Sequence, residues 1–233
     1  MATVLITGAN KGIGYETARQ LVVAGHTVYV GSRDPARGRA AAERLGARPI
    51  QLDITDDASV QAAVATIEAD GGLDVLVNNA AVEERGDGNA VIGPVDVTAD
   101  LVRKTFDTNV FGTVRVLHAF LPLLQRSASP VVVNVSSGLG SLSVVASMPA
   151  NLYPGVAYPA SKAAVNMITV QYAKALPNMR INAADPGFTK TDLNGNTGTQ
   201  TVEEGAAIIV QLAQVGSDGP TGGLFNVHGA VPW

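Results

Sequence analysis

Short β-branched runs alternate along the whole chain with longer segments rich in Ala, Leu, Glu and Arg. The runs lie at 3–7, 27–31, 48–52, 73–77, 130–135, 180–184 and 222–227. They show no regular apolar–polar alternation, which indicates strands that are covered on both faces. Helical patterns fill most of the gaps, beginning with 12–24 and 35–46. This order predicts an α/β fold with a doubly wound, mostly parallel sheet of seven strands flanked by helices.

No linker, internal repeat or low-complexity tract divides the 233 residues, of which 46% are hydrophobic. We therefore expect a single domain over residues 1–233. Two segments rich in Gly and Pro interrupt the rhythm, at 83–96 and at 138–157. We expect both to be loops at the carboxyl ends of strands, where open α/β sheets bind their ligands.

Charge and composition exclude several classes of protein. The net charge is −4 and the 16 Lys and Arg form no basic run, so we expect no nucleic-acid partner. The chain has no cysteine and its 3 histidines lie far apart, which argues against a metal site. No signal-like segment opens the chain, and no apolar run approaches the ~20 residues that cross a bilayer. We expect a cytoplasmic protein with no membrane partner.

The sequence TGANKGIG, at 7–14, follows the first predicted strand and opens the first predicted helix. Gly8, Gly12 and Gly14 allow a tight turn, close approach of a pyrophosphate and close packing of the helix on the strand. The N–H groups at the start of the helix suit a diphosphate. The spacing differs from the G-x-G-x-x-G of most dinucleotide folds, and no G-K-[ST] follows as a P-loop requires. The turn favours a dinucleotide site.

Tyr158 and Lys162 stand four residues apart in the run AYPASKAAV, at 157–165. On a helix this spacing places both side chains on one face. A nearby ammonium favours the phenolate, so we expect Lys162 to lower the pKa of the tyrosine from about 10 toward neutrality. General acid–base catalysis is most efficient when the pKa of the catalytic group lies near the working pH. Taken alone, the pair also fits two ordinary residues of a helix surface.

Together with the glycine turn, six further segments resemble, in the same order, the short-chain dehydrogenase/reductase family. The segments are LDIT (52–55), NNAA (78–81), TNVFG (108–112), NVSSG (134–138), YPASK (158–162) and INAADPGFTKTD (181–192). One departure is Ala81, which replaces the glycine of the family's N-N-A-G. NKGIG, PGFTKTD and the ending GPTGGLFNVHGAVPW resemble the carbonyl-reductase-like branch. The resemblance covers essentially the whole chain and implies a Rossmann-type oxidoreductase that uses a nicotinamide cofactor.

The resemblance also implies a role for each matched residue. Tyr158 protonates a carbonyl oxygen or deprotonates an alcohol, Lys162 binds the nicotinamide ribose, and Asn109 holds a water that relays protons to Lys162. Ser137, the second serine of its pair, polarises the substrate carbonyl, while Ser136 supports the strand end. The residues implied for the cofactor are Gly8, Asn10, Lys11, Gly12, Ile13, Gly14, Ser32, Arg33, Asp53, Ile54, Asn79, Ala80, Ala81, Tyr158, Lys162, Pro186, Gly187, Thr189 and Thr191. Asp53 stands where the family contacts the adenine.

The choice between NAD(H) and NADP(H) depends on the end of the second predicted strand. Asp34 lies 20 residues after Gly14, about the distance at which an acid binds the ribose of NAD. The two-residue alternation of the strand, however, places Ser32 at the selecting position, and Arg33 follows. A guanidinium can bind a 2′-phosphate with two hydrogen bonds, although Arg33 could instead be a solvated charge paired with Asp34. Lys11 adds a second cation of the kind that NADP-preferring family members carry, so we predict NADP(H).

The distance from Ser137 to Tyr158 is longer than in most family members. We expect the extra residues, an insertion at about 138–157, to fold over or beside a substrate pocket. The residues expected to line it are Leu142, Val144, Val145, Met148, Leu152, Tyr153, Phe188 and Leu193. Mostly apolar walls favour a hydrophobic ketone, aldehyde or diketone. Tyr153 is not the catalytic tyrosine, because Ala157 follows four residues on, and Trp233 either caps the site or packs at a subunit contact.

The leading hypothesis is an NADPH-dependent reductase of ketones or aldehydes, which in reverse is a secondary-alcohol dehydrogenase. One alternative is an NAD-linked dehydrogenase with Asp34 as its ribose ligand. Another is a non-catalytic sensor that binds NADP, although a sensor would not need both Tyr158 and Lys162. The resemblance further implies a dimer or tetramer formed through long helices at about 98–125 and 157–176, a face that an insertion before the tyrosine can obstruct.

Overall fold

One sheet of eight strands forms the centre of the molecule in the computed structural model, which describes all residues 1–233. The strands are β1 (Thr3–Ile6), β2 (Thr27–Ser32), β3 (Arg48–Gln51), β4 (Val75–Asn78), β5 (Val131–Val135), β6 (Arg180–Ala184), β7 (Leu224–Asn226) and β8 (Gly229–Val231). Their order in the sheet is β3-β2-β1-β4-β5-β6-β7-β8, and all neighbours are parallel except the antiparallel pair β7–β8. This is the doubly wound order: successive strands are added in one direction from β1 and in the opposite direction from β4.

The predicted strand count of seven was wrong by one, because β8 carries no apolar run. It has three residues, Gly229, Ala230 and Val231, the first two of them exposed, and it forms a hairpin with β7 at the edge of the sheet. A short strand at the edge of a sheet makes few packing contacts, so its sequence lacks the apolar β-branched run that marks the buried strands. The seven predicted strands all exist, each close to its expected position.

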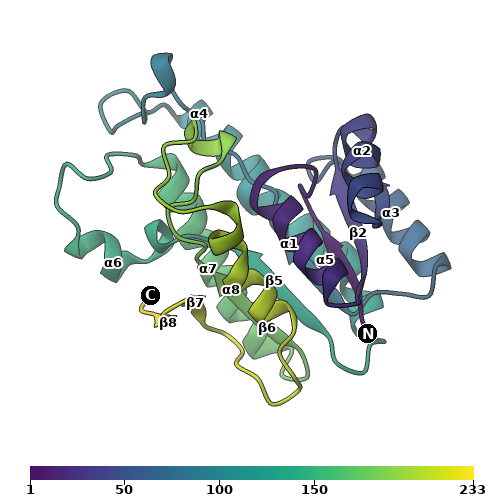
Figure 1. Ribbon diagram of the computed structural model, residues 1–233. Helices are drawn as coiled ribbons and strands as arrows, with labels where there is room; N and C mark the ends of the chain where they lie inside the picture. The colour runs from purple at the N-terminus through teal and green to yellow at the C-terminus, as the bar shows by residue number, and fades with distance from the viewer.

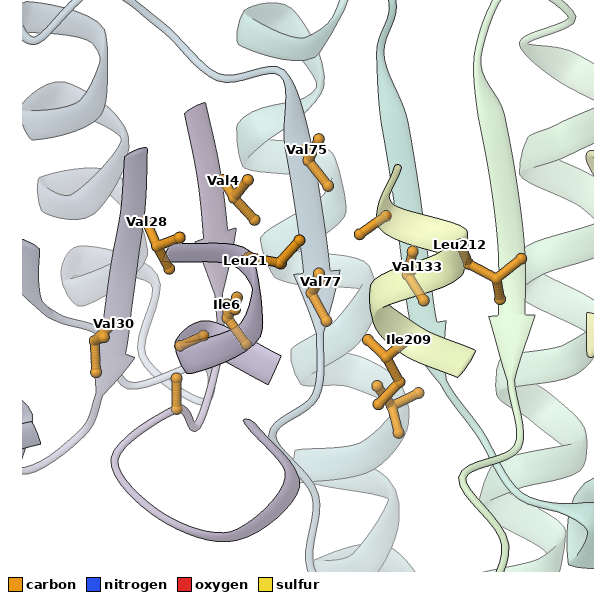
Figure 2. Packing of buried hydrophobic residues seen from close by; sticks show 14 of the residues in the cluster. Val4, Ile6, Leu21, Val28, Val30, Val75, Val77, Val133, Ile209 and Leu212 are labelled. Carbon is orange, nitrogen blue, oxygen red and sulfur yellow. The ribbon is translucent and has the colours of Figure 1, made fainter. Parts of the chain in front are cut away.

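Helices cover both faces of the sheet. One face carries α1 (Gly12–Val23), α2 (Pro35–Leu45) and α8 (Val202–Ala213), and the other carries α3 (Asp57–Ala69), α5 (Thr113–Leu124) and α7 (Ala157–Ala175). Neighbouring residues of β1 point to opposite faces, so Val4 and Ile6 pack with the first set of helices and Leu5 with the second. Figure 2 shows side chains of α1 and α8 lying over the valines of the central strands. Burial on both faces explains why the strands lack polar alternation.

The long helix predicted at 98–125 consists of three parts. These are α4 (Ala99–Phe106), a π-helical turn (Asp107–Gly112) and α5. The extra residue of a π turn locally rotates the side chains that follow it, and such turns are common at functional sites. Here the turn carries Asn109, which is buried.

Both segments that interrupt the sequence pattern are found where they were expected, after the carboxyl ends of β4 and β5. The insertion at 138–157 contains the short helix α6 (Leu142–Ser147), which stands clear of the sheet and beside the C-terminal residues (Figure 1). The Ser143 N–H donates to the carbonyl of Trp233 at 3.1 Å. None of the helices combines the length and the apolar character that a membrane span needs.

A chain of buried polar side chains ties α7 to the middle of the sheet. The Asn78 amide donates to the Asn134 carbonyl oxygen at 2.9 Å, and the Asn134 amide donates to the Thr169 hydroxyl at 2.9 Å. Asn134 and Thr169 are completely buried, so no water can replace either partner. Buried polar groups contribute stability only while every partner is present.

Replacing Thr169 with Val should therefore lower the free energy of unfolding by about 2 kcal/mol, because it leaves the Asn134 amide without an acceptor at nearly unchanged volume. Urea unfolding followed by circular dichroism measures the change. Thr66→Val is the matched control, since the exposed Thr66 hydroxyl donates only to a carbonyl of its own helix. Equal stability of both variants would show that the buried chain contributes nothing.

Candidate active site

A cleft of about 1090 Å³ opens at the carboxyl edge of the sheet. It is lined by the segments that follow β1, β2, β3, β4, β5 and β6, which meet there because all six strands are parallel. The order of the sheet turns between β1 and β4, so the chains that leave these two strands diverge to opposite faces. The crevice between them is the place where ligands of open α/β sheets bind.

Hydrogen bonds between Thr7 and Asn79 join the ends of β1 and β4. The Thr7 hydroxyl accepts from the N–H groups of Asn79 at 2.9 Å and Ala80 at 3.0 Å. In return, the Asn79 amide donates to the carbonyls of Thr7 at 2.9 Å and Gly8 at 3.2 Å. Asn79 and Ala80, the central pair of NNAA, thus fix the backbone of the glycine turn.

Two glycines of the turn stand where no larger residue fits. Gly8 has φ +64°, and a Cβ there would lie 3.0 Å from the Ala80 backbone. A Cβ on Gly14 would lie 2.4 Å from the Asn79 amide nitrogen. Ala81, where the family has glycine, has no positive φ, so the alanine introduces no strain.

The start of α1 faces the cleft with unused hydrogen-bond donors. Its N-cap residue, Lys11, gives no side-chain hydrogen bond to the first turn. Free N–H groups at a helix N-terminus suit an anion such as a diphosphate, so the residues present fit a dinucleotide. The Lys11 ammonium itself contacts the Asp192 carboxylate at 2.7 Å, across the cleft from the glycine turn.

Three consecutive residues at the end of β2 differ in what they can reach. Arg33 lines the cleft and forms no ion pair. Asp34 is the N-cap of α2: its carboxylate accepts from the N–H groups of Ala36 and Arg37 and pairs with the Arg37 side chain at 3.3 Å. Ser32 is 2% exposed and its hydroxyl donates to the Asp34 carbonyl. Of these three residues, Arg33 alone is free to bind an anion in the cleft, because it is not paired with Asp34.

Tyr158 and Lys162 lie on the first turns of α7 and both line the cleft, together with Ser137 from the end of β5. The Lys162 ammonium is 5.5 Å from the centre of the Tyr158 ring. It is buried and donates to the carbonyl of Val135 at 2.7 Å. A phenol, an ammonium and a hydroxyl are thereby brought to one wall from two elements.

The neighbouring residues Ser136 and Asn109 have structural partners. Ser136 is buried, and its hydroxyl donates to the Asn166 side chain at 2.6 Å, which ties the end of β5 to α7. The Asn109 side chain accepts from the Val82 N–H at 2.8 Å and donates to the Val82 carbonyl and the Ser161 hydroxyl. Asn109 therefore joins the loop after β4 to α7, and its role toward a water stays a prediction.

The expected lowering of the Tyr158 pKa is not found. Burial, and next the carboxylates of Glu83 and Asp185, raise the pKa of the Tyr158 phenol above its usual range, while Arg85 lowers it by less. Burial also lowers the pKa of Lys162 to about 8. Burial of the phenol, which the spacing of Tyr158 and Lys162 does not reveal, has the largest effect on its pKa, and the cation that opposes the increase is Arg85.

Comparison with known proteins agrees with this geometry. A sequence model described as short chain dehydrogenase matches residues 2–202. The chain belongs to the short-chain dehydrogenase family. It is 34% identical to (+)-neomenthol dehydrogenase of Capsicum annuum over 95% of this chain and 94% of that protein, and 31% identical to salutaridine reductase of Papaver bracteatum over 97% and 94%. A solved NADPH-bound carbonyl reductase from chicken fatty liver covers 100% of this chain and 99% of its own, with a TM-score of 0.87 and 27% identity.

As a short-chain dehydrogenase, the protein is an oxidoreductase that acts on CH–OH or C=O groups. The structure places most of the predicted site residues on the one cleft. Those that line it are Gly8, Asn10, Lys11, Gly12, Ile13, Gly14, Arg33, Asp53, Ile54, Asn79, Ala80, Ala81, Ser137, Tyr158, Lys162, Pro186, Gly187, Thr189 and Thr191. Ser32 and Asn109 are buried outside its lining.

The predicted substrate wall needs two corrections. Val144, Met148, Leu152, Tyr153, Phe188 and Leu193 line the cleft as expected. Leu142 and Val145 do not, because α6 turns them outward, where they are 76% and 39% exposed. Trp233 does not line the cleft either, and its carbonyl accepts from Ser143 instead. The six-residue helix α6 presents only one side to the cleft, so only some of its apolar residues can line it. The apolar run in the sequence does not show which ones.

The sequence of this short-chain dehydrogenase did not predict several charged residues that line the cleft. Glu83 and Arg85, in the loop after β4, and Asp185, at the end of β6, all line the cleft. Glu83 and Arg85 form an ion pair at 2.8 Å with side chains only 7% and 13% exposed. The signal that could have found Asp185 is its place directly before the Pro-Gly pair in a segment already assigned to the cofactor. Nothing in the local sequence distinguishes Glu83 from a surface charge.

Lys162→Met should make the protein more stable at pH 7, by about 2 kcal/mol after the lost hydrogen bond is subtracted. The folded pKa of Lys162 is about 8, below the unfolded value near 10.4, so below pH 8 folding bears the full cost of a buried ammonium. Between pH 8 and about 10 the unfolded chain binds more protons and the native protein gains stability, so the advantage of the variant should shrink.

Urea unfolding at pH 7 and pH 10 measures this effect. Lys174→Met, in the last turn of the same helix at an exposed position, is the control and should show no such pH dependence. A Lys162→Met protein less stable than the wild type at pH 7 would contradict the account of the buried ammonium.

Proposed function

We propose that the protein is an NADPH-dependent reductase of ketones or aldehydes, which in reverse oxidises secondary alcohols. The observation that carries the proposal is the common wall formed by Ser137, Tyr158 and Lys162 on a cleft that also contains the glycine turn. In this arrangement a carbonyl placed against Ser137 and Tyr158 can also reach a cofactor held at the start of α1.

In the proposed reduction, the Ser137 hydroxyl donates a hydrogen bond to the substrate carbonyl and orients it. NADPH, when bound, supplies the hydride that adds to the carbonyl carbon. The Tyr158 hydroxyl gives its proton to the carbonyl oxygen, and the alcohol results. Burial and the neighbouring acids keep the Tyr158 phenol protonated, so it carries the proton that the reduction requires. Lys162 would bind the nicotinamide ribose, and Asn109 would hold the water that returns a proton to Lys162.

Arg33 supports NADP(H) over NAD(H). It is a free cation on the cleft lip, whereas the alternative ribose ligand, Asp34, is occupied in capping α2 and lies outside the cleft lining. Gly8, Gly12 and Gly14 would hold the diphosphate, and Asp53 and Ile54 would contact the adenine. The NADPH-bound carbonyl reductase whose structure resembles this chain agrees with the same choice.

Apolar side chains in the lining of the cleft support a hydrophobic carbonyl substrate. Val144, Met148, Leu152 and Phe188 lie there, and the relatives include a neomenthol dehydrogenase and a salutaridine reductase. Such a lining binds aromatic ketones, α-diketones or aliphatic aldehydes in preference to sugars. The presence of both Tyr158 and Lys162 on the cleft favours an enzyme over a sensor.

The test is the initial rate of NADPH and NADH oxidation over a panel of aromatic ketones, α-diketones and aldehydes. We expect turnover with NADPH, and a fall in kcat of about 10²–10⁴-fold in Tyr158→Phe. Tyr172→Phe, the same change farther along α7, should leave the rate unchanged. An unaltered rate in Tyr158→Phe would contradict the catalytic assignment, and turnover with NADH alone would contradict the cofactor assignment.

Arg33→Ala should weaken NADPH binding by about 10–100-fold and leave NADH binding nearly unchanged, because only NADPH carries a 2′-phosphate for the guanidinium. Quenching of protein fluorescence on titration with each cofactor gives the two dissociation constants. Arg37→Ala is the control, since Arg37 lies on α2 outside the cleft lining. An equal loss for both cofactors in Arg33→Ala would rule out a specific phosphate contact.

A further inference from the structure

Three loops that are far apart in sequence meet beside Tyr158. They are the loop after β4 (83–96), the insertion before α7 (138–157) and the segment after β6 (185–200). In Figure 1 they gather on the side of the sheet where α4 and α6 lie. The wall that they form carries most of the side chains proposed to bind the carbonyl substrate, so whatever holds the loops together sets the shape of that wall.

Glu83 is the residue that connects the first two loops. One carboxylate oxygen accepts a hydrogen bond from the Tyr153 hydroxyl of the insertion. The other oxygen accepts from the Arg85 guanidinium at 2.8 Å. Both oxygens are therefore occupied, and only 7% of the side chain is exposed. A carboxylate in such a place costs free energy unless every one of its partners is kept.

Arg85 extends the connection to the third loop. A second nitrogen of its guanidinium donates to the Asn89 carbonyl at 3.2 Å, and the Asn89 amide donates to the Asn194 carbonyl at 3.1 Å. Asn194 is buried, and its amide donates to the Thr189 carbonyl in the segment proposed to bind the cofactor. Hydrogen bonds therefore run without a break from the substrate insertion to the cofactor segment.

We propose that Glu83 is a positioning residue, which by binding Tyr153 and Arg85 together locks the three loops into the wall against which the carbonyl substrate is placed. This inference rests on the proposed reductase function, because a wall of fixed shape matters for orienting a substrate toward Tyr158. Neither Glu83 nor Tyr153 gives or takes a proton in the reaction. Tyr153 has its hydroxyl directed at Glu83, where burial and the carboxylate raise the pKa of the phenol.

Glu83 also acts on Tyr158 through its charge. The titratable groups that face the Tyr158 phenol are Glu83, Arg85, Tyr153, Lys162 and Asp185. Of the carboxylates, Glu83 has the larger effect in raising the Tyr158 pKa, and Arg85 opposes it. Removing the charge of Glu83 should lower the pKa of Tyr158, since the carboxylate disfavours the phenolate.

Two variants separate the tether from the charge. Tyr153→Phe removes the hydrogen bond and keeps the carboxylate, so we expect the KM for the ketone to rise about tenfold while kcat and the NADPH dissociation constant stay within twofold. Glu83→Gln keeps an acceptor for Tyr153 and removes the charge, so the alkaline limb of the pH–rate profile should move down by roughly 0.5–1 pH unit. Tyr153→Phe should leave that limb in place.

Controls of the same chemistry are Tyr172→Phe on α7 and Glu68→Gln, an exposed residue paired with Arg126. Neither should alter KM or the pH profile. Equal losses of kcat, ketone affinity and NADPH affinity in Tyr153→Phe would show a merely structural contact and overturn the proposal. An unchanged KM in that variant would overturn it as well.

Hydrogen–deuterium exchange tests the tether without turnover. Tyr153→Phe should increase the exchange of amides in 148–156 by about tenfold relative to the wild type, with no change in α3. Exchange that stays at the wild-type rate would overturn the proposal. If the wild type reduces no carbonyl compound in the panel while the exchange changes as expected, the proposed function fails and the lock on the loops stands.

Discussion

The hydrogen bonds between Thr7 and Asn79 hold together the two strands from which the chain departs to opposite faces of the sheet. The crevice exists only because β1 and β4 are neighbours whose following segments diverge. If these ends separated, the glycine turn would lose its fixed backbone, and the start of α1 would no longer face the cleft. The close approach of Gly14 to the Asn79 amide shows how little room remains at this junction.

A second constraint is the burial of polar groups beneath the reacting side chains. Lys162 has a pKa of about 8 because its ammonium is desolvated, and its one partner in the protein is the Val135 carbonyl. Beside this contact, the Ser136 hydroxyl lies within hydrogen-bond distance of the Lys162 carbonyl and of the Asn166 side chain. A protein selected for stability alone would have an apolar residue at position 162. The buried ammonium lowers the stability of the fold, which indicates that it is retained for function.

The half of the cleft proposed to bind the substrate is built differently from the half proposed to bind the cofactor. The cofactor half rests on strand ends and helix starts that the core holds in place, whereas the substrate half consists of loops joined by side-chain contacts such as those of Glu83 and Arg85. Loops can change without disturbing the sheet, which is how one fold accommodates many substrates. The charged residues at 83, 85 and 185 line the cleft beside the apolar side chains.

The sequence by itself determined the doubly wound sheet, the glycine turn after the first strand and the position of Tyr158 and Lys162 on one helix. Each of these follows from periodicity or from spacing within one element, where neighbours in sequence are neighbours in space. The edge strand β8, the outward face of α6, the raised pKa of Tyr158 and the contacts of Glu83 were decided only by the tertiary structure. They depend on groups far apart in sequence, and such groups acquire a common environment only after the parallel strands have brought their carboxyl ends to one edge of the sheet.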